Sequence, residues 1–307
     1  MKKVTVIGGG TGSYTLLKGL KNYDLDIAGI VATSDSGGSS GKLRDEFGIL
    51  PPGDIRKCLI ALSDKGRVWR DLFEYRFEGE NEKNNLGNLI MTALNKIHGD
   101  LPSAIKYASE ILDVKGNVLP VTLDNVHLCA ELEDGQIITG ETNIDIPKHN
   151  PALKIKKVYL QPNAFAYKMA VERIINSDFV VIGPGDLYTS IIPNLIVNGI
   201  SEAIQKTNAK LIYVCNVMTK HGETNNFKAS DFLKEVENYL GKKVDYVILN
   251  SQMPSEDVSK KYAGENSYFV ELDLDGERVI KSNLIGKDIS LFRHDSNKLA
   301  KEIMEII

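Results

Sequence analysis

The sequence has few cysteines, no excess of positive charge and no long hydrophobic run. Its three cysteines, Cys58, Cys129 and Cys215, are odd in number and widely spaced, which argues against a disulfide framework and against metal-ligand spacing. The formal net charge of -4 provides no basic field for nucleic acid. No apolar run approaches membrane-spanning length. We therefore expect a cytoplasmic protein with buried thiols, no nucleic-acid partner and no membrane span.

Common catalytic signatures are also missing. Residues 37–42 superficially resemble a phosphate loop but do not form a Walker A motif, and no Gly-x-Ser-x-Gly elbow occurs. The five histidines are scattered, and no pair of carboxylates is spaced for acid–base catalysis. The sequence alone therefore assigns no catalytic residue, no metal ligand and no required cofactor.

The hydrophobic pattern predicts an α/β protein with a Rossmann-like, doubly wound and mostly parallel sheet. Short apolar runs at 4–7, 27–31, 179–182, 211–215 and 244–249 alternate with segments of helical spacing, such as 230–240 and the tail from 296. We expect one domain over residues 1–307. It contains a helical segment at about 54–112 and a small antiparallel β insertion at about 117–160, in which Asp134-Gly135 indicates a hairpin.

The first predicted strand ends in a glycine-rich run, Gly8-Gly9-Gly10-Thr11-Gly12. Glycines at 8 and 10 match a dinucleotide-binding fingerprint, but Ser13 stands where the third glycine belongs. The run could be a tight strand-to-helix turn without a ligand. We favour a ligand, because four glycines exceed what a turn needs and the following helix N-terminus carries partial positive charge.

The run from Asp35 to Arg44 combines glycine N–H groups, serine hydroxyls and cationic side chains. Together with Asp54 in the block Pro-Pro-Gly-Asp-Ile-Arg, this mixture is typical of a loop that holds a phosphorylated ligand. Asp35 follows a strand, where a carboxylate can bind a ribose hydroxyl, hold a metal or simply cap a turn. We expect the loop to be mobile without ligand and ordered by phosphate.

A second glycine turn, Gly183-Pro184-Gly185-Asp186, follows another buried strand, where open α/β sheets bind ligands. The alternative is a turn with a helix cap. Asparagine amides could contact a base or sugar, or could cap turns, and Arg293 would suit a diphosphate. The predicted binding residues are Gly9, Gly10, Thr11, Gly12, Asp35, Gly38, Ser39, Ser40, Lys42, Arg44, Asp54, Asn88, Gly183, Gly185, Asp186, Thr189, Asn216 and Arg293.

Taken in order, these motifs resemble the gluconeogenesis factor (YvcK) branch of the CofD-like family, whose archaeal branch is 2-phospho-L-lactate transferase. The resemblance rests on the two glycine turns, the serine-glycine and Pro-Pro-Gly-Asp blocks, Leu86-Gly87-Asn88, Cys215-Asn216 and Arg293-His294-Asp295. It runs from residue 1 to about residue 300. The chain departs from the family pattern at three positions, where Ser36 replaces an aspartate, Asn84 a histidine and Asp186 a serine.

The resemblance implies a Rossmann-like fold and a bacterial protein that binds UDP-sugars such as UDP-N-acetylglucosamine. It also implies a role in cell shape and cell-wall synthesis during gluconeogenic growth. We further expect a homo-oligomer and a cell-wall regulatory protein as partner. The alternative is a phospholactate-type transferase that uses a nucleotide-diphosphate donor and Mg²⁺. An NAD(P) oxidoreductase would rest on the first glycine turn alone. The missing histidine favours regulatory binding over catalysis.

Overall fold

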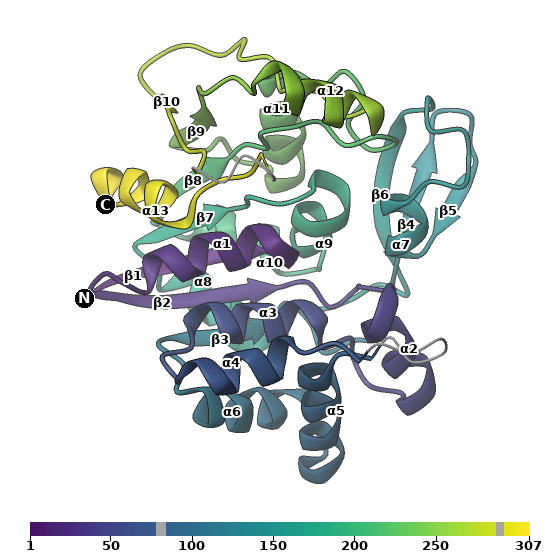
Figure 1. Cartoon of the computed structure of the whole chain (residues 1–307), viewed down its shortest axis with the longest axis vertical. Coiled ribbons are helices and arrows are strands. Elements are labelled where there is room, and N and C mark those ends of the chain that lie inside the picture. Colours follow the sequence, from purple (N-terminus) through teal and green to yellow (C-terminus); the bar gives the residue numbers. More distant parts are fainter. Residues whose placement is uncertain (78–83, 287–291) are drawn as a thin grey trace.

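The computed structural model describes residues 1–77, 84–286 and 292–307, and a seven-stranded sheet runs through these residues (Figure 1). The strand order is β10-β9-β8-β7-β1-β2-β3, and all neighbours are parallel. The strands of this main sheet are β1 (Lys2–Gly8), β2 (Leu25–Val31), β3 (Asn117–Pro120), β7 (Phe179–Ile182), β8 (Lys210–Val214), β9 (Tyr246–Asn250) and β10 (Val279–Ser282).

Helices cover both faces of the main sheet, which confirms the predicted α/β class. In Figure 1, α1, α3 and α13 lie in front of the sheet, and α8 and α10 lie behind it. The helices are α1 (Gly10–Leu20), α2 (Gly38–Phe47), α3 (Gly53–Leu62), α4 (Arg67–Glu74), α5 (Leu86–His98), α6 (Leu101–Leu112), α7 (Glu141–Asp145), α8 (Lys168–Ile175), η1 (Leu187–Ile191), α9 (Ile192–Leu195), α10 (Ile200–Lys206), α11 (Ala229–Leu240), α12 (Glu256–Gly264) and α13 (Ser296–Ile306), of which η1 is a π-helix.

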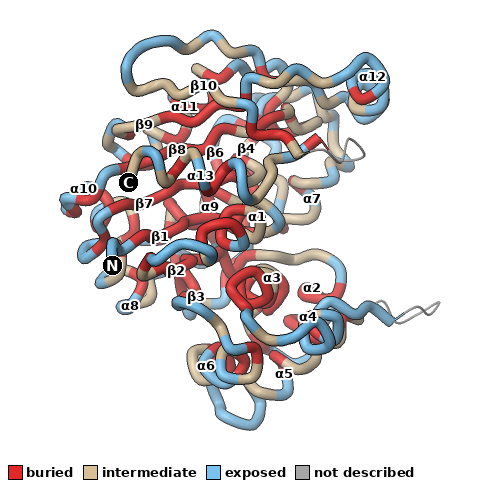
Figure 2. The backbone as a smooth tube through the Cα atoms, turned by 60° about the vertical axis from the view of Figure 1, so that its left-hand side comes forward, coloured by how far each residue is buried: buried red, intermediate tan, exposed pale blue. Residues whose placement is uncertain are grey.

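The central strands are mostly apolar because both of their faces are buried. In β7, Val180 and Ile182 join the core beneath α8–α11, whereas Phe179 and Val181 join the core beneath α1, α3 and α13. Figure 2 shows these strands as a continuous buried centre. Alternate side chains of a strand point to opposite faces, so a strand buried on both sides has few positions for polar residues.

The order of the strands reverses between β1 and β7. From β1 the chain builds outward through β2 to β3, and from β7 it builds in the other direction through β8 and β9 to β10. Ligands of open α/β sheets bind at such a switch point, outside the carboxyl ends of the strands. The two glycine turns follow β1 and β7, so both lie at this point.

A second, antiparallel sheet of order β5-β4-β6 is present within the described residues. It contains β4 (His127–Leu132), β5 (Ile137–Thr139) and β6 (Ile155–Gln161), and the predicted hairpin at Asp134-Gly135 joins β4 to β5. The predicted start of the insertion at residue 117 is wrong, because Asn117–Pro120 pairs with β2 as an edge strand of the main sheet. A four-residue strand gives no sequence signal of which sheet it joins.

The expected loop between Asp35 and Arg44 is also wrong, since α2 begins at Gly38. Its glycines and serines favour a loop, but tertiary contacts override this preference. Leu43 is buried, and the buried Arg44 guanidinium donates to the Val126 carbonyl at 2.8 Å. The helix is therefore anchored to the core and to the segment that leads into β4.

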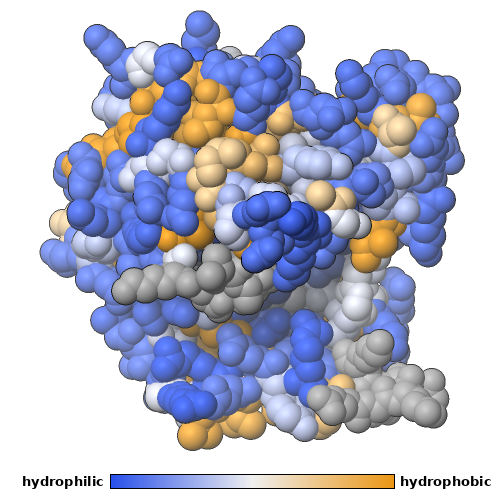
Figure 3. Space-filling view, turned by 45° about the horizontal axis from the view of Figure 1, so that its top comes forward, coloured by the Kyte–Doolittle hydropathy of each residue, from blue (hydrophilic) through white to orange (hydrophobic). Residues whose placement is uncertain are grey.

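The surface is mostly hydrophilic on the face drawn in Figure 3, with scattered apolar areas. Among the described helices, none combines the length and apolar character needed to cross a membrane.

Candidate functional site

A pocket of about 410 Å³ opens at the switch point, at the carboxyl ends of β1, β2, β7 and β8. It is lined by eleven of the predicted binding residues, namely Gly9, Gly10, Thr11, Gly12, Asp35, Asp54, Gly185, Asp186, Thr189, Asn216 and Arg293. Segments far apart in the sequence therefore converge on one space, as the glycine turns suggested. The volume lies within the range of about 300–1,000 Å³ typical of small-molecule sites.

The first wall is the turn from β1 into α1. Gly10 has φ +62°, a left-handed conformation that disfavours other residues. A Cβ on Gly12 would lie 2.1 Å from the Pro184 carbonyl oxygen, so only glycine lets α1 approach the second turn this closely. The N-terminus of α1, with its unpaired N–H groups, borders the pocket.

The second wall is the turn from β7 into η1. Gly183, which has φ +80°, shapes the turn but does not line the pocket. The Asn216 amide donates to the Gly185 carbonyl at 2.8 Å, and the Thr189 hydroxyl donates to Glu223 Oε1 at 3.1 Å. Asn216 and Thr189 thus hold the turn in place, which is a positioning role that sequence reasoning did not assign to them.

Carboxylates line the side of the pocket below α1. Asp35 accepts the Gly37 N–H at 2.8 Å, and a Cβ on Gly9 would lie 2.8 Å from Asp54 Oδ2. Burial and the nearby Asp54 charge raise the pKa of Asp35. Burial and the charges of Asp35 and Asp145 raise the pKa of Glu141, at the start of α7, to about 7. Lys57 pairs with Asp54 at 3.1 Å.

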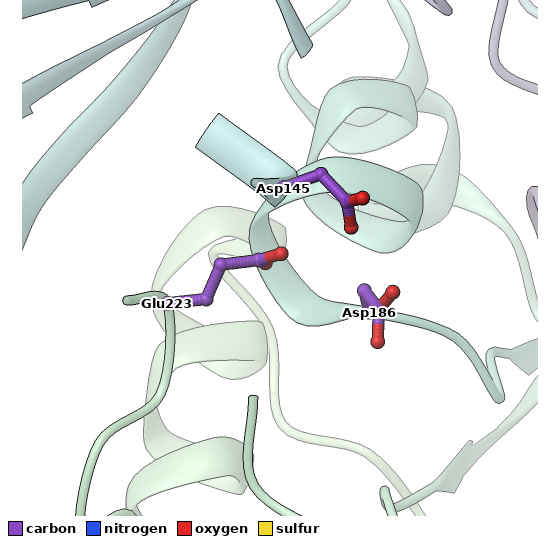
Figure 4. A group of neighbouring side chains, drawn as sticks. All are labelled: Asp145, Asp186 and Glu223. Carbon is purple, nitrogen blue, oxygen red and sulfur yellow. The ribbon is translucent and has the colours of Figure 1, made fainter. Parts of the chain in front are cut away.

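A second group of carboxyls, Asp145, Asp186 and Glu223, has one oxygen from each residue within 4.8 Å of the others (Figure 4). This spacing and donor type would suit a hard cation such as Mg²⁺. However, Lys220 Nζ lies 2.7 Å from Asp145 Oδ1 and 3.6 Å from Asp186 Oδ2. A lysine ammonium therefore already supplies positive charge to the group, and a metal ion would compete with it.

The far side of the pocket contains Tyr262, Phe292, Arg293 and His294. The Phe292 N–H donates to the Tyr262 hydroxyl at 3.2 Å, which ties the two aromatic residues together. The Arg293 side chain is exposed. Burial lowers the pKa of His294 to about 4, so its imidazole is neutral near pH 7. Its Nε2 has no hydrogen-bond partner.

The other predicted residues, Gly38, Ser39, Ser40, Lys42, Arg44 and Asn88, do not line the pocket. The Asn88 amide donates to the hydroxyls of Ser39 and Ser40 at 3.2 and 3.4 Å, and its carbonyl accepts from Arg56. These polar groups satisfy one another inside the protein, as buried polar groups generally do. The serine-glycine block thus joins α2 to α5, and only its start, at Asp35, reaches the pocket.

Sequence reasoning missed several pocket residues, among them Lys57, Glu141, Lys220, Tyr262 and Phe292. Lys57 has a local signal, because it lies one helical turn after Asp54. Glu141 and Lys220 reach the pocket from α7 and from the segment after β8, and neither residue lies in a phosphate-binding motif.

Comparison with known proteins identifies the family. Residues 4–290 match the family described as 2-phospho-L-lactate transferase CofD. Since this match spans most of the chain, the chain belongs to the CofD family.

Its relatives include gluconeogenesis factors. The chain is 44% identical over 317 residues to a Thermotoga maritima protein named "Putative gluconeogenesis factor", with 99% of each chain covered. It is 40% identical over 314 residues to the Bacillus subtilis protein named "Gluconeogenesis factor", with 99% of this chain and 98% of the relative covered. A crystal structure of a Bacillus halodurans protein matches with a TM-score of 0.94 at 40% identity, covering 99% of each chain. Another structure from that organism, described as a UPF0052 family member, also has a TM-score of 0.94.

Proposed function

We propose that this chain is a regulatory protein that binds a nucleotide sugar of the UDP-N-acetylglucosamine type in the switch-point pocket. The observation that carries the proposal is the convergence of two glycine turns, after β1 and β7, on one polar pocket. Backbone N–H groups of such turns, together with a helix N-terminus, are suited to phosphate oxygens.

The diphosphate would lie between the two turns, near Lys220 and Arg293. A guanidinium offers two parallel N–H donors, and an ammonium offers a point charge. Tyr262, which is partly exposed, offers an aromatic ring for the base or the sugar. Asp35 follows β2, where a carboxylate can accept a ribose hydroxyl.

The biological role that we propose is support of cell shape and cell-wall synthesis during growth on gluconeogenic carbon sources. The names of the relatives support the link to gluconeogenesis. The role in cell shape and cell-wall synthesis is what the family resemblance implies. A strain that lacks the protein should grow normally on glucose but lose normal shape on a gluconeogenic carbon source. The wild-type chain should restore the shape, and Arg293→Ala should not.

Isothermal titration calorimetry with UDP-N-acetylglucosamine tests the binding directly. We expect saturable binding and a raised melting temperature, because a ligand that binds only the native state stabilises it by mass action. No heat and no melting shift at roughly 1 mM ligand, well above a typical small-ligand dissociation constant, would refute the proposal.

A second candidate is a transferase that acts on a nucleotide-diphosphate-linked donor with a divalent metal. The observation in its favour is Glu141, whose pKa of about 7 suits a general base, in the same pocket as Asp35 and Asp54. Incubation with nucleotide-diphosphate donors and Mg²⁺, followed by mass spectrometry, separates the two candidates. A new product that Glu141→Gln abolishes would favour the transferase.

A further inference from the structure

Asp186, the last residue of the second glycine turn, places a carboxylate on the pocket wall. Its side chain is 40% exposed, and its carboxylate lies 3.6 Å from the Lys220 ammonium. Lys220 is bound more closely by Asp145, at 2.7 Å. Figure 4 shows the carboxyl groups of Asp145, Asp186 and Glu223 gathered around a common space. A ligand phosphate near Lys220 would therefore also lie near Asp186.

The charges of this group do not leave a surplus of positive charge. Glu223 is 3% exposed, and it accepts the Tyr188 N–H at 3.2 Å and the Thr189 hydroxyl at 3.1 Å. Burial, and then the Asp186 charge, raise the pKa of Glu223. Lys220, with one positive charge, faces the side chains of both Asp145 and Asp186, so the group offers a ligand phosphate no unshared cation.

We infer that Asp186 makes the pocket prefer a nucleoside diphosphate ester over a free nucleoside diphosphate. The inference rests on the proposed function and specifies the ligand of the same pocket. In a nucleotide sugar, the terminal phosphate is esterified and carries one negative charge. In the free diphosphate, that phosphate ionises a second time near pH 6 and carries about one more charge. Two like charges about 5 Å apart near a protein surface repel strongly enough to change affinity by about tenfold or more.

The preference is measured by calorimetric titration with UDP-N-acetylglucosamine and with UDP at pH 8, in EDTA. The chelator is needed because Mg²⁺ would neutralise the extra charge of UDP. The wild-type chain should bind UDP-N-acetylglucosamine more tightly. Asp186→Asn should reduce the ratio of the UDP dissociation constant to the UDP-N-acetylglucosamine dissociation constant by about tenfold. The change should come mainly from tighter binding of UDP. Asp186→Ser, which also removes the charge, should behave in the same way.

The control is Asp71→Asn, because Asp71 is an exposed aspartate on α4 that does not line the pocket. It removes the same formal charge and should leave the ratio unchanged. If the Asp186 variants keep the wild-type melting temperature and the wild-type ratio, or if both ligands gain equally, the inference is overturned and the proposed function stands. If the wild-type chain binds neither ligand, the proposed function is refuted and the inference with it.

Discussion

Gly12→Ala tests the close approach of the two glycine turns, on which the geometry of the pocket depends. The added methyl group would lie 2.1 Å from the Pro184 carbonyl oxygen and 2.5 Å from the Pro184 carbonyl carbon. Both partners are backbone atoms, so no side chain can rotate away. The first distance is more than an ångström short of ordinary contact. Either α1 or the Gly183–Asp186 turn must therefore move.

Such overpacking typically costs about 1–3 kcal/mol, while alanine regains about 1 kcal/mol of intrinsic helix preference. We expect Gly12→Ala to lower the free energy of unfolding, measured by urea denaturation, by up to about 2 kcal/mol. Because the turns separate, affinity for UDP-N-acetylglucosamine should fall by about tenfold, which corresponds to about 1.4 kcal/mol.

Gly264→Ala is the matched control, since Gly264 lies in helix α12 and a Cβ there meets nothing within 4 Å. It should be neutral, or stabilising by up to about 1 kcal/mol, and should not alter binding. If Gly12→Ala matches the wild type in both stability and affinity, the two turns do not constrain each other and the reasoning is refuted.

Three further substitutions separate binding from stability. Arg293→Ala should weaken UDP-N-acetylglucosamine binding by about 1.5–3 kcal/mol in calorimetry, with partial recovery in Arg293→Lys; normal binding would remove Arg293 from the site. Arg44→Met leaves the buried Val126 carbonyl without its donor, so urea denaturation should show a free energy of unfolding lower by about 1–3 kcal/mol, with unchanged ligand affinity. Weakened ligand binding at equal stability would contradict this. The pKa of Glu141 is raised from 4.5 to about 7 in the folded state, so the folded protein holds this proton more tightly than the unfolded chain does. The free energy of unfolding should therefore fall as pH rises from about 4.5 to about 7. Glu141→Gln should remove up to about 3 kcal/mol of this pH dependence, and an unchanged profile would show that Glu141 is not perturbed.

The parts of the fold that could be predicted are those with strong local patterns. β1, β2 and β7 are mostly apolar runs rich in β-branched residues, and α11 has clear helical spacing. By contrast, β10 is a four-residue strand at the edge of the sheet with no fully buried residue, so it lacks the apolar run that marks its neighbours. α2 is helical because Leu43 and Arg44 are anchored by contacts distant in sequence, which local propensity does not contain.

The candidate site divides in the same way. The two glycine turns could be predicted to line the site, because glycines that follow a buried strand are typical of a ligand-binding turn in an open α/β sheet. The prediction that the serine-glycine block binds phosphate in this pocket is not supported, because Ser39 and Ser40 accept hydrogen bonds from Asn88 and do not line the pocket. Lys220 and Glu141 could not be predicted as pocket residues, because they reach the switch point only through the tertiary fold. Their sequence neighbourhoods carry no phosphate-binding signature.

A structure of the protein bound to UDP-N-acetylglucosamine is the most direct test of the central claim, that the two glycine turns form a diphosphate site. We predict the diphosphate between the N-terminus of α1 and the Gly183–Asp186 turn, with Arg293 in contact with a phosphate oxygen. A nucleotide sugar bound elsewhere on the protein, with the switch-point pocket unchanged, would contradict the account.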